Sequence, residues 1–284
     1  MKYSNRKTNL GRNLARTLRR NLGLWAAVLG ALYLPVSASG QEEHIDDGHS
    51  HGLHFAHPLF SESITPDTKV RFDSGREWEA EGTASELELE AEYGFHPAFS
   101  IEVVAPYHFV RPDAGPNESG FGNVELALKF ANFAFEDKGL LLGYGLEVGM
   151  PTGNDATGIG SGHIWEIEPF LGIGFMTGNW ELVNRTRFGI PIHQDPGEEV
   201  ETELHYDFSA LYHFSPRLQG LLELNGLVGL SGDEAGEGMV SLSPGIKVAP
   251  FAGHTLFVGL GGSFPLGDEE LDARLKLAFF YHFE

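Results

Sequence analysis

The chain has 284 residues, with 19 basic and 40 acidic side chains and no cysteine. Without cysteine it has no disulfide framework, no thiolate metal site, no cysteine nucleophile and no attachment point for an N-terminal lipid anchor. Its formal charge of −21 argues against nucleic acid as a partner, because phosphate binding needs a basic surface.

Residues 1–40 have the features of a secretory signal peptide. They contain seven basic residues and no acidic one, and the apolar run Leu22–Val36 precedes the small residues Ser37-Ala38-Ser39-Gly40. A basic start, an apolar run and a small-residue cleavage zone define such a signal, and this run is too short for a transmembrane helix. Cleavage after Ala38 or Gly40 is expected to leave 12 basic against 40 acidic residues, a formal charge of −28.

The acidic segment 41–65 that follows is rich in histidine. Its candidate metal ligands are His44, His49, His51, His54 and His57. Imidazole and carboxylate groups together bind zinc, nickel or copper, but a flexible tract binds them weakly unless it folds around the ion. The alternatives are a solvated periplasmic tail and a segment tucked into the mouth of the domain that follows. No cofactor other than such a divalent metal is expected.

From residue 66 onward, apolar and polar residues alternate with the period of a β-strand. Leu87, Leu89, Ala91 and Tyr93 alternate with Glu86, Glu88, Glu90 and Glu92, and the same period recurs over residues 124–130, 142–150, 204–214 and 275–283. Segments of about 9–11 residues with one apolar face are typical of strands that cross a bilayer in a barrel. Lipid offers no hydrogen-bond partners, so the backbone groups of such a sheet must pair among themselves and the sheet must close.

The connections between these segments alternate between two classes. Short ones lie near residues 96–98, 134–138, 177–179, 215–217 and 250–254, and long ones near 110–120, 151–162, 191–201, 231–238 and 266–270. In outer-membrane barrels the short turns face the periplasm and the long loops face outside. The last strand must then end in the periplasm.

An even number of strands requires one more strand before residue 84. Asp67–Trp78 is the candidate, with Val70 and Phe72 facing lipid and with Lys69 and Arg71 facing inward. Residues 66–284 are therefore predicted to form an all-β fold, a transmembrane antiparallel up-and-down barrel of twelve strands in the outer membrane. The expected partners are the lipid bilayer, lipopolysaccharide and the machinery that assembles outer-membrane barrels.

The inward positions of this barrel carry many charges. The candidate lumen and selectivity residues are Glu86, Glu88, Glu90, Glu92, Glu147, Glu166, Arg185, Arg187, Arg274 and Lys276. Opposite charges on neighbouring strands can pair and hold the wall in register. The excess of carboxylates can also attract cations and repel anions. The two interpretations are compatible.

An enzymatic function is not expected. His205, Asp207, Ser209 and His213 face one way on one strand, but residues four positions apart on a strand are separated by about 13 Å, too far for a serine–histidine pair. The sequence contains no G-x-S-x-G elbow, no H-E-x-x-H and no P-loop.

Three short motifs carry a family resemblance. Gly120-Phe121-Gly122-Asn123, then Pro151-Thr152-Gly153-Asn154, then the glycine-spaced stretch 158–162 resemble an outer-membrane family associated with meta-pathway phenol degradation. Asn123 stands where that family usually has an acid. The resemblance implies an outer-membrane channel or transporter for a small solute, such as an aromatic or other apolar molecule. The alternatives are a divalent-metal uptake barrel that uses the histidine segment and a non-transporting structural or surface-binding barrel.

Overall fold

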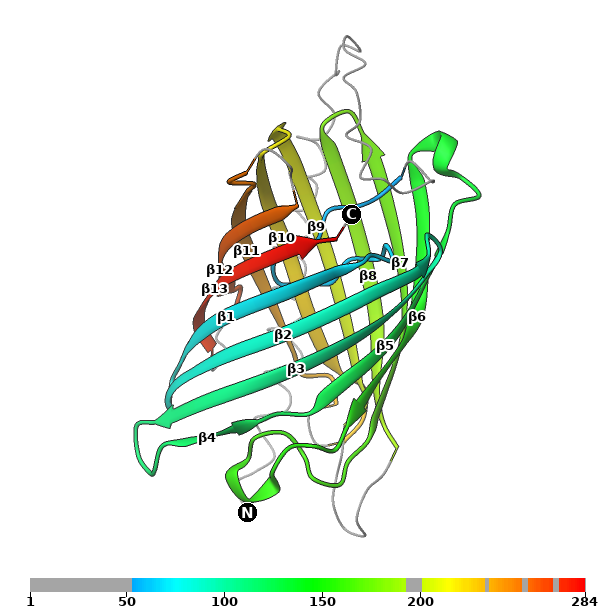
Figure 1. The fold of residues 1–284 in the computed structure, drawn as a ribbon. Helices are drawn as coiled ribbons and strands as arrows, with labels where there is room; N and C mark the ends of the chain where they lie inside the picture. Colours follow the sequence, from blue (N-terminus) through cyan, green and yellow to red (C-terminus); the bar gives the residue numbers. More distant parts are fainter. Residues whose placement is uncertain (1–52, 193–200, 233–234, 252–254, 268–270, 284) are drawn as a thin grey trace. The chain divides into compact units, whose positions relative to one another are not determined.

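A computed structural model describes residues 53–192, 201–232, 235–251, 255–267 and 271–283 (Figure 1). The expected signal peptide and the candidate ligands His44, His49 and His51 lie outside the described residues. No helix among the described residues is long and apolar enough to cross a membrane.

The described chain folds almost entirely into β-strands. In chain order they are β1 (Lys69–Glu79), β2 (Gly82–His96), β3 (Phe99–Pro112), β4 (Glu118–Phe121), β5 (Val124–Asn132), β6 (Leu140–Met150), β7 (Glu166–Thr177), β8 (Trp180–Pro191), β9 (Glu203–Ser215), β10 (Leu218–Gly229), β11 (Gly238–Val248), β12 (Leu256–Pro265) and β13 (Leu271–His282). Each is antiparallel to its neighbours. Two 3₁₀ turns, Glu136–Lys138 and Asp155–Thr157, lie in connections.

The sheet closes because β1 pairs with the last strand as well as with β2. Val70 lies opposite Tyr281 on one side and opposite Ala91 on the other. The predicted first strand is therefore confirmed, with bounds shifted by two residues at the start and one at the end. Closure leaves no unpaired sheet edge to face lipid.

The short strand β4 belongs to the same wall strand as β5. Both pair with β3: β5 with its first part, and β4 with residues 107–110. Gly122-Asn123 makes the bend between them. Counted this way the ring has twelve strands, so the closed twelve-stranded antiparallel barrel confirms the predicted fold.

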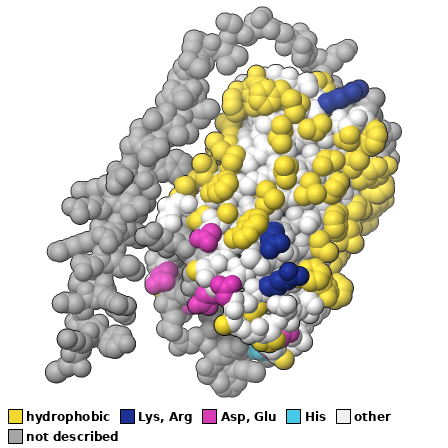
Figure 2. Space-filling model, turned by 90° about the vertical axis from the view of Figure 1, so that its left-hand side faces the viewer, with side chains coloured by type: hydrophobic (Ala, Val, Ile, Leu, Met, Phe, Trp, Pro, Cys, Tyr) yellow, Lys and Arg dark blue, Asp and Glu magenta, His cyan; other side chains and the backbone are white. Residues whose placement is uncertain are grey.

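The two faces of the wall follow the alternation in the sequence. On β2, Leu89 and Tyr93 are 52% and 58% exposed, whereas the side chains of Glu90 and Glu92 are buried. Hydrophobic side chains cover most of the outer wall on the face that Figure 2 draws. Burial alternates along this strand as the sequence pattern predicts, and β1 follows the same rule, with Lys69 buried and Phe72 exposed.

The connections alternate as expected only in part. Two residues follow β2, β7 and β9, and 15, 11 and 8 residues follow β6, β8 and β10, but the seven residues after β5 and after β11 outnumber the five after β3 and after β12. One connection at the long-loop end was not expected: only residues 80–81 separate β1 from β2. This two-residue turn joins β1, which carries Lys69, Arg71 and Asp73, to β2, which carries the glutamates of residues 86–92.

The segment before β1 lies inside the ring of strands (Figure 1). Phe55 and Ile64 are fully buried against a cluster that includes Leu141 of β6 and Val183 of β8. Leu59 is buried with a second cluster, whose wall members are Leu211, Leu221, Ala278 and Phe280. The tucked-in alternative is therefore correct, and a solvated tail is wrong for residues 53–65, here called the lumen segment.

A charge on the outer face should destabilise this barrel strongly. Leu146→Arg and Phe208→Arg should each lower the free energy of unfolding by about 2–4 kcal/mol if they lie near the bilayer midplane, because an arginine there is taken out of water. Denaturant titration of the refolded protein in lipid measures the effect.

The matched control is Gly75→Ser on the inner face of β1. The nearest heavy atom to a Cβ added at Gly75 is 3.9 Å away, so this change should have little effect. Equal destabilisation by the control and by the two arginine variants would show that the faces are wrongly assigned.

Candidate functional site

The candidate site is the lumen, where the wall holds an irregular stretch of backbone through side-chain hydrogen bonds. The Ala56 amide donates to Glu181 at 2.8 Å, and the Leu59 amide donates to Glu223 at 2.8 Å. A buried backbone group outside regular structure needs such a partner. Wall carboxylates therefore do for the lumen segment what a neighbouring strand does inside a sheet.

Glu223 is the main acceptor. Its carboxylate also accepts hydrogen bonds from the amides of Phe60 and Ser61 and from the Ser61 hydroxyl, the last two at 3.0 Å. The Ser61 and Ser209 hydroxyl oxygens lie 2.9 Å apart. Several donors on one buried carboxylate give a strong, charge-assisted cluster. Glu223 of β10 and Ser209 of β9 thus fix residues 59–61 on the wall.

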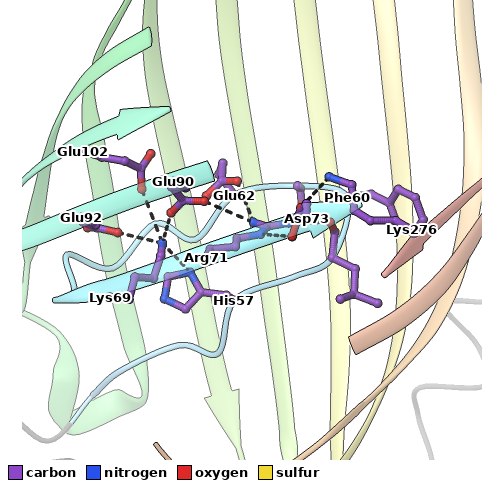
Figure 3. Close-up of polar contacts among 12 residues, drawn as sticks. His57, Phe60, Glu62, Lys69, Arg71, Asp73, Glu90, Glu92, Glu102 and Lys276 are labelled. Carbon is purple, nitrogen blue, oxygen red and sulfur yellow. Dashed lines mark hydrogen bonds and ion pairs between the residues drawn. The ribbon is translucent and has the colours of Figure 1, made fainter. Parts of the chain in front are cut away.

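Two wall cations bind carbonyl oxygens of the same segment. Lys247 donates to the carbonyl of His57 at 2.6 Å, and Arg71 donates to the carbonyl of Leu59 at 2.7 Å. Arg71 also forms an ion pair of 2.8 Å with Glu62, which the lumen segment contributes (Figure 3). Positive and negative wall groups together satisfy both kinds of backbone group.

A buried network of ion pairs continues from Arg71 across β1, β2, β3, β5 and β13, and Figure 3 shows its members Lys69, Arg71 and Lys276 with their carboxylates. The partners are Lys69 with Glu90, Glu92 and Glu102, Lys129 with Glu102 and Glu92, and Arg71 and Lys276 with Asp73. The predicted pairing of Lys69 and Arg71 with the glutamate ladder of β2 is thereby observed. Such a network holds its strands in register, since removing one partner would leave a charge buried alone.

A second group of pairs lies on β6, β7 and β8, where Arg185 pairs with Glu147 and Arg187 lies 3.2 Å from Glu168. Arg274 of β13 pairs with Glu77 on the neighbouring β1. Four further inward carboxylates make no ion pair with lysine or arginine within the described part of the chain: Glu86, Glu88, Glu125 and Glu166. They lie toward the long-loop ends of β2, β5 and β7. The carboxyl groups of the lumen without a lysine or arginine partner are therefore concentrated toward the outer side.

His54 and His57, two of the five predicted metal ligands, come together with two residues that the sequence did not indicate. His57 Nε2 is 3.0 Å and His282 Nδ1 is 2.7 Å from the same oxygen, Oδ2 of Asp67. His54 Nε2 is 3.7 Å from it. His57 Nδ1 lies 3.1 Å from the Lys69 ammonium, which can only donate, so Nδ1 accepts there and this ring is neutral.

The polar residues of β9 do not form a catalytic set. His205 lies 3.1 Å from Glu203, Asp207 accepts from Asn225 at 2.8 Å, and Ser209 contacts Ser61. His213 hydrogen-bonds to Glu181. Each of the four has a different partner, as the strand spacing predicts.

The inward glycines explain how the wall makes room for the lumen segment. A Cβ at Gly174 would lie 2.6 Å from the Phe55 ring, one at Gly143 2.7 Å from Ile64 Cβ, and one at Gly245 2.5 Å from Leu59. Glycine allows another chain to approach a strand this closely. The glycine content was the signal in the sequence that could have indicated a filled lumen.

Comparisons with known proteins agree with this fold. A family model described as "Putative MetA-pathway of phenol degradation" matches residues 58–279. The chain belongs to this family. The match begins inside the lumen segment and ends in β13, and family and fold together place the protein in the outer membrane.

Two solved structures show the same architecture. An outer membrane channel from Pseudomonas putida F1 is 15% identical with a TM-score of 0.60, over 81% of this chain and 100% of that one. The NanC porin is 8% identical with a TM-score of 0.52, over 76% of this chain and 99% of its own. At these identities the likeness shows the fold alone. A search of curated proteins finds no match.

A side chain at Gly174 should loosen the lumen segment. Gly174→Val should push Phe55 off the wall, because the two would overlap, and amide hydrogen exchange over residues 53–65 should become faster. Gly75→Val, also inward but with only ordinary van der Waals contacts at its Cβ position, should leave that exchange unchanged. Unchanged exchange in the Gly174 variant would contradict the packing described here.

Proposed function

We propose that this protein is an outer-membrane channel for a small neutral or cationic solute and that the lumen segment closes it. The observation that carries the proposal is that the wall encloses a stretch of chain outside the sheet, continuous with β1 and otherwise held to the wall by non-covalent contacts. A ring that accommodates this stretch becomes a passage when the stretch leaves. The porin and channel architecture of the solved structures supports the same conclusion.

The chemistry of the wall favours an aromatic or other apolar solute. Two apolar bays face the lumen: one at Gly143, Gly174 and Leu141 receives Ile64 and Phe55, and one at Gly245, Leu211 and Leu221 receives Leu59. A surface that fits these side chains also fits a free molecule of similar shape and polarity once they are gone. The family's description, which names phenol degradation, agrees with this class.

The carboxylates near the outer side would select solutes by their charge. In their ionised form, Glu86, Glu88, Glu125 and Glu166 would add a negative field where a solute would enter, and such a field raises the local concentration of cations and repels anions. The deeper charges contribute little to it because Lys69, Lys129 and Arg71 lie against their carboxylates. A neutral apolar solute or a small cation therefore fits this lumen better than an anion.

A disulfide between the lumen segment and the wall should hold the channel closed. Ser61→Cys with Ser209→Cys replaces two hydroxyls whose oxygens are 2.9 Å apart, and the native chain has no other thiol. Planar-bilayer conductance should fall on oxidation and return on reduction, because the bond prevents residues 59–61 from leaving.

The two single-cysteine variants are the controls, and oxidation should not change their conductance. Conductance that is equal in the oxidised and reduced double variant would show that passage does not require the segment to move. A protein that shows no conductance in any of these forms would favour the non-transporting alternative.

The outer carboxylates should set ion preference. Replacing Glu86 and Glu88 with glutamine should shift the reversal potential in a salt gradient toward lower cation preference, because these groups have no basic partner that already neutralises them. Glu136→Gln, in an exposed turn between β5 and β6, is the control. An equal shift in both would indicate a general charge effect and not a lumen effect.

A further inference from the structure

Three imidazoles converge on one carboxylate at the short-turn end of the lumen. Asp67 Oδ2 lies 2.7 Å from His282, 3.0 Å from His57 and 3.7 Å from His54. In a tetrahedral zinc site with bonds of about 2.0–2.1 Å, neighbouring ligand atoms lie about 3.3 Å apart. The distances from Asp67 bracket that value, and the ligand atoms of His54, His57 and Asp67 all lie within 4.8 Å of one another. His282, which already contacts Asp67, would have to turn toward the other two imidazoles to share one ion with them.

From this arrangement we propose that His54, His57, Asp67 and His282 bind one divalent transition-metal ion of the zinc class. Three imidazole nitrogens and one carboxylate oxygen complete a four-coordinate shell with ligands that zinc prefers. The inference does not depend on the proposed channel activity.

The surroundings hold the ligands in place. Asp67 Oδ1 accepts the amide of Thr68 at 2.6 Å, which leaves Oδ2 for the histidines. The ring of His57 stacks on Phe280 with centroids 6.1 Å apart. A carboxylate fixed through its second oxygen and a ring fixed by stacking are already oriented, and such outer contacts strengthen metal binding.

An ion can reach the ligands from one side. A cavity of about 130 Å³ is lined by His54 and Asp67 together with Leu53, His96 and Phe133, among others. This volume is larger than an ion and a few waters need. The cavity lies beside the turn that connects β2 and β3, the same end at which β13 finishes.

Binding requires a proton rearrangement at His57. Its Nδ1 lies 3.1 Å from the Lys69 ammonium while Nε2 faces Asp67, so Nδ1 accepts there and Nε2 carries the proton. A metal on Nε2 displaces that proton, and Nδ1 then carries one and gives up the contact with Lys69. Lys69 keeps Glu90 and Glu92 as partners, so its charge remains compensated.

A second group of carboxylates does not qualify as a metal site. Oxygens of Glu62, Glu90 and Glu102 lie within 4.8 Å of one another. Lys69, Arg71 and Lys129 already form ion pairs with these groups. A cation added there would have to displace ammonium or guanidinium groups that are buried with them.

The proposed site joins two distant parts of the chain. His54 and His57 lie in the lumen segment, Asp67 lies just before β1, and His282 ends β13. A bound ion would therefore attach the lumen segment to the strand that closes the barrel.

The test is zinc binding by calorimetry to the mature, folded protein in detergent, with the variants chosen to separate two histidine groups. His44→Gln, His49→Gln and His51→Gln together should leave one zinc site intact. His57→Gln with His282→Gln should weaken that site by about tenfold or more. His205→Gln, which changes a lumen histidine near the start of β9 at the long-loop end, should have no effect.

Three further measurements separate loss of the site from poor folding and report its coordination. Heat-modifiability on gels checks the barrel, and Asp67→Asn, which keeps the shape of the side chain, should also weaken zinc binding. The native protein with cobalt in place of zinc should show the strong visible absorption of tetrahedral coordination. Loss of all zinc binding in the triple tail variant, or unchanged affinity in the His57–His282 and Asp67 variants, would overturn the proposal.

Discussion

An irregular stretch of backbone cannot remain inside a barrel unless its amide and carbonyl groups find partners there. In this protein the wall supplies them from charged side chains: Glu181 and Glu223 accept amides, and Lys247 and Arg71 donate to carbonyls. Those wall charges are buried as well, so the charged side chains and the backbone groups of the lumen segment each lower the desolvation cost of the other. Removing one partner of such a buried pair typically costs about 3–5 kcal/mol because the other charge remains unpaired. The lumen segment and the polar wall are thus parts of one interior.

The polar contacts that hold the lumen segment differ from those of a purely apolar core in what replaces them when the segment leaves the barrel. The net gain from a hydrogen bond is only about 0.5–1.5 kcal/mol because water replaces the lost partner, and water entering the lumen would do so for Glu223 and Lys247. The apolar contacts of Phe55 and Leu59 have no such substitute. Their glycine-lined bays would face water, and an apolar molecule that fills them would recover part of the lost burial. The same geometry therefore supports both closure by the segment and affinity for an apolar solute.

The sequence was enough to predict most of the barrel wall but little of what fills the lumen. Period-two alternation identifies strands and their faces, and this was enough for the twelve strands, for β1 and for the pairing of Lys69 with the glutamates of β2. It carries no information on where an irregular segment lies. The contact between Leu59 and Glu223 joins residues 164 apart in sequence, and that between Asp67 and His282 joins residues 215 apart. The signals that existed were indirect, namely inward glycines such as Gly174 and apolar residues among the histidines.

A metal at His54, His57, Asp67 and His282 would act on closure only through a difference in affinity between two states. In the state described here, His282 on the wall and His57 in the lumen segment face the same oxygen. In a state with the segment outside the barrel, His282 would stay behind. The ion would then favour the closed state by an amount that grows with its concentration, about 2.7 kcal/mol at one hundred times its Kd if the open state does not bind it. His44, His49 and His51 precede the site in the chain, and any zinc they bind in the open state reduces that amount. The effect of zinc on closure is thus set by how strongly His54, His57, Asp67 and His282 together outcompete His44, His49 and His51 for the ion.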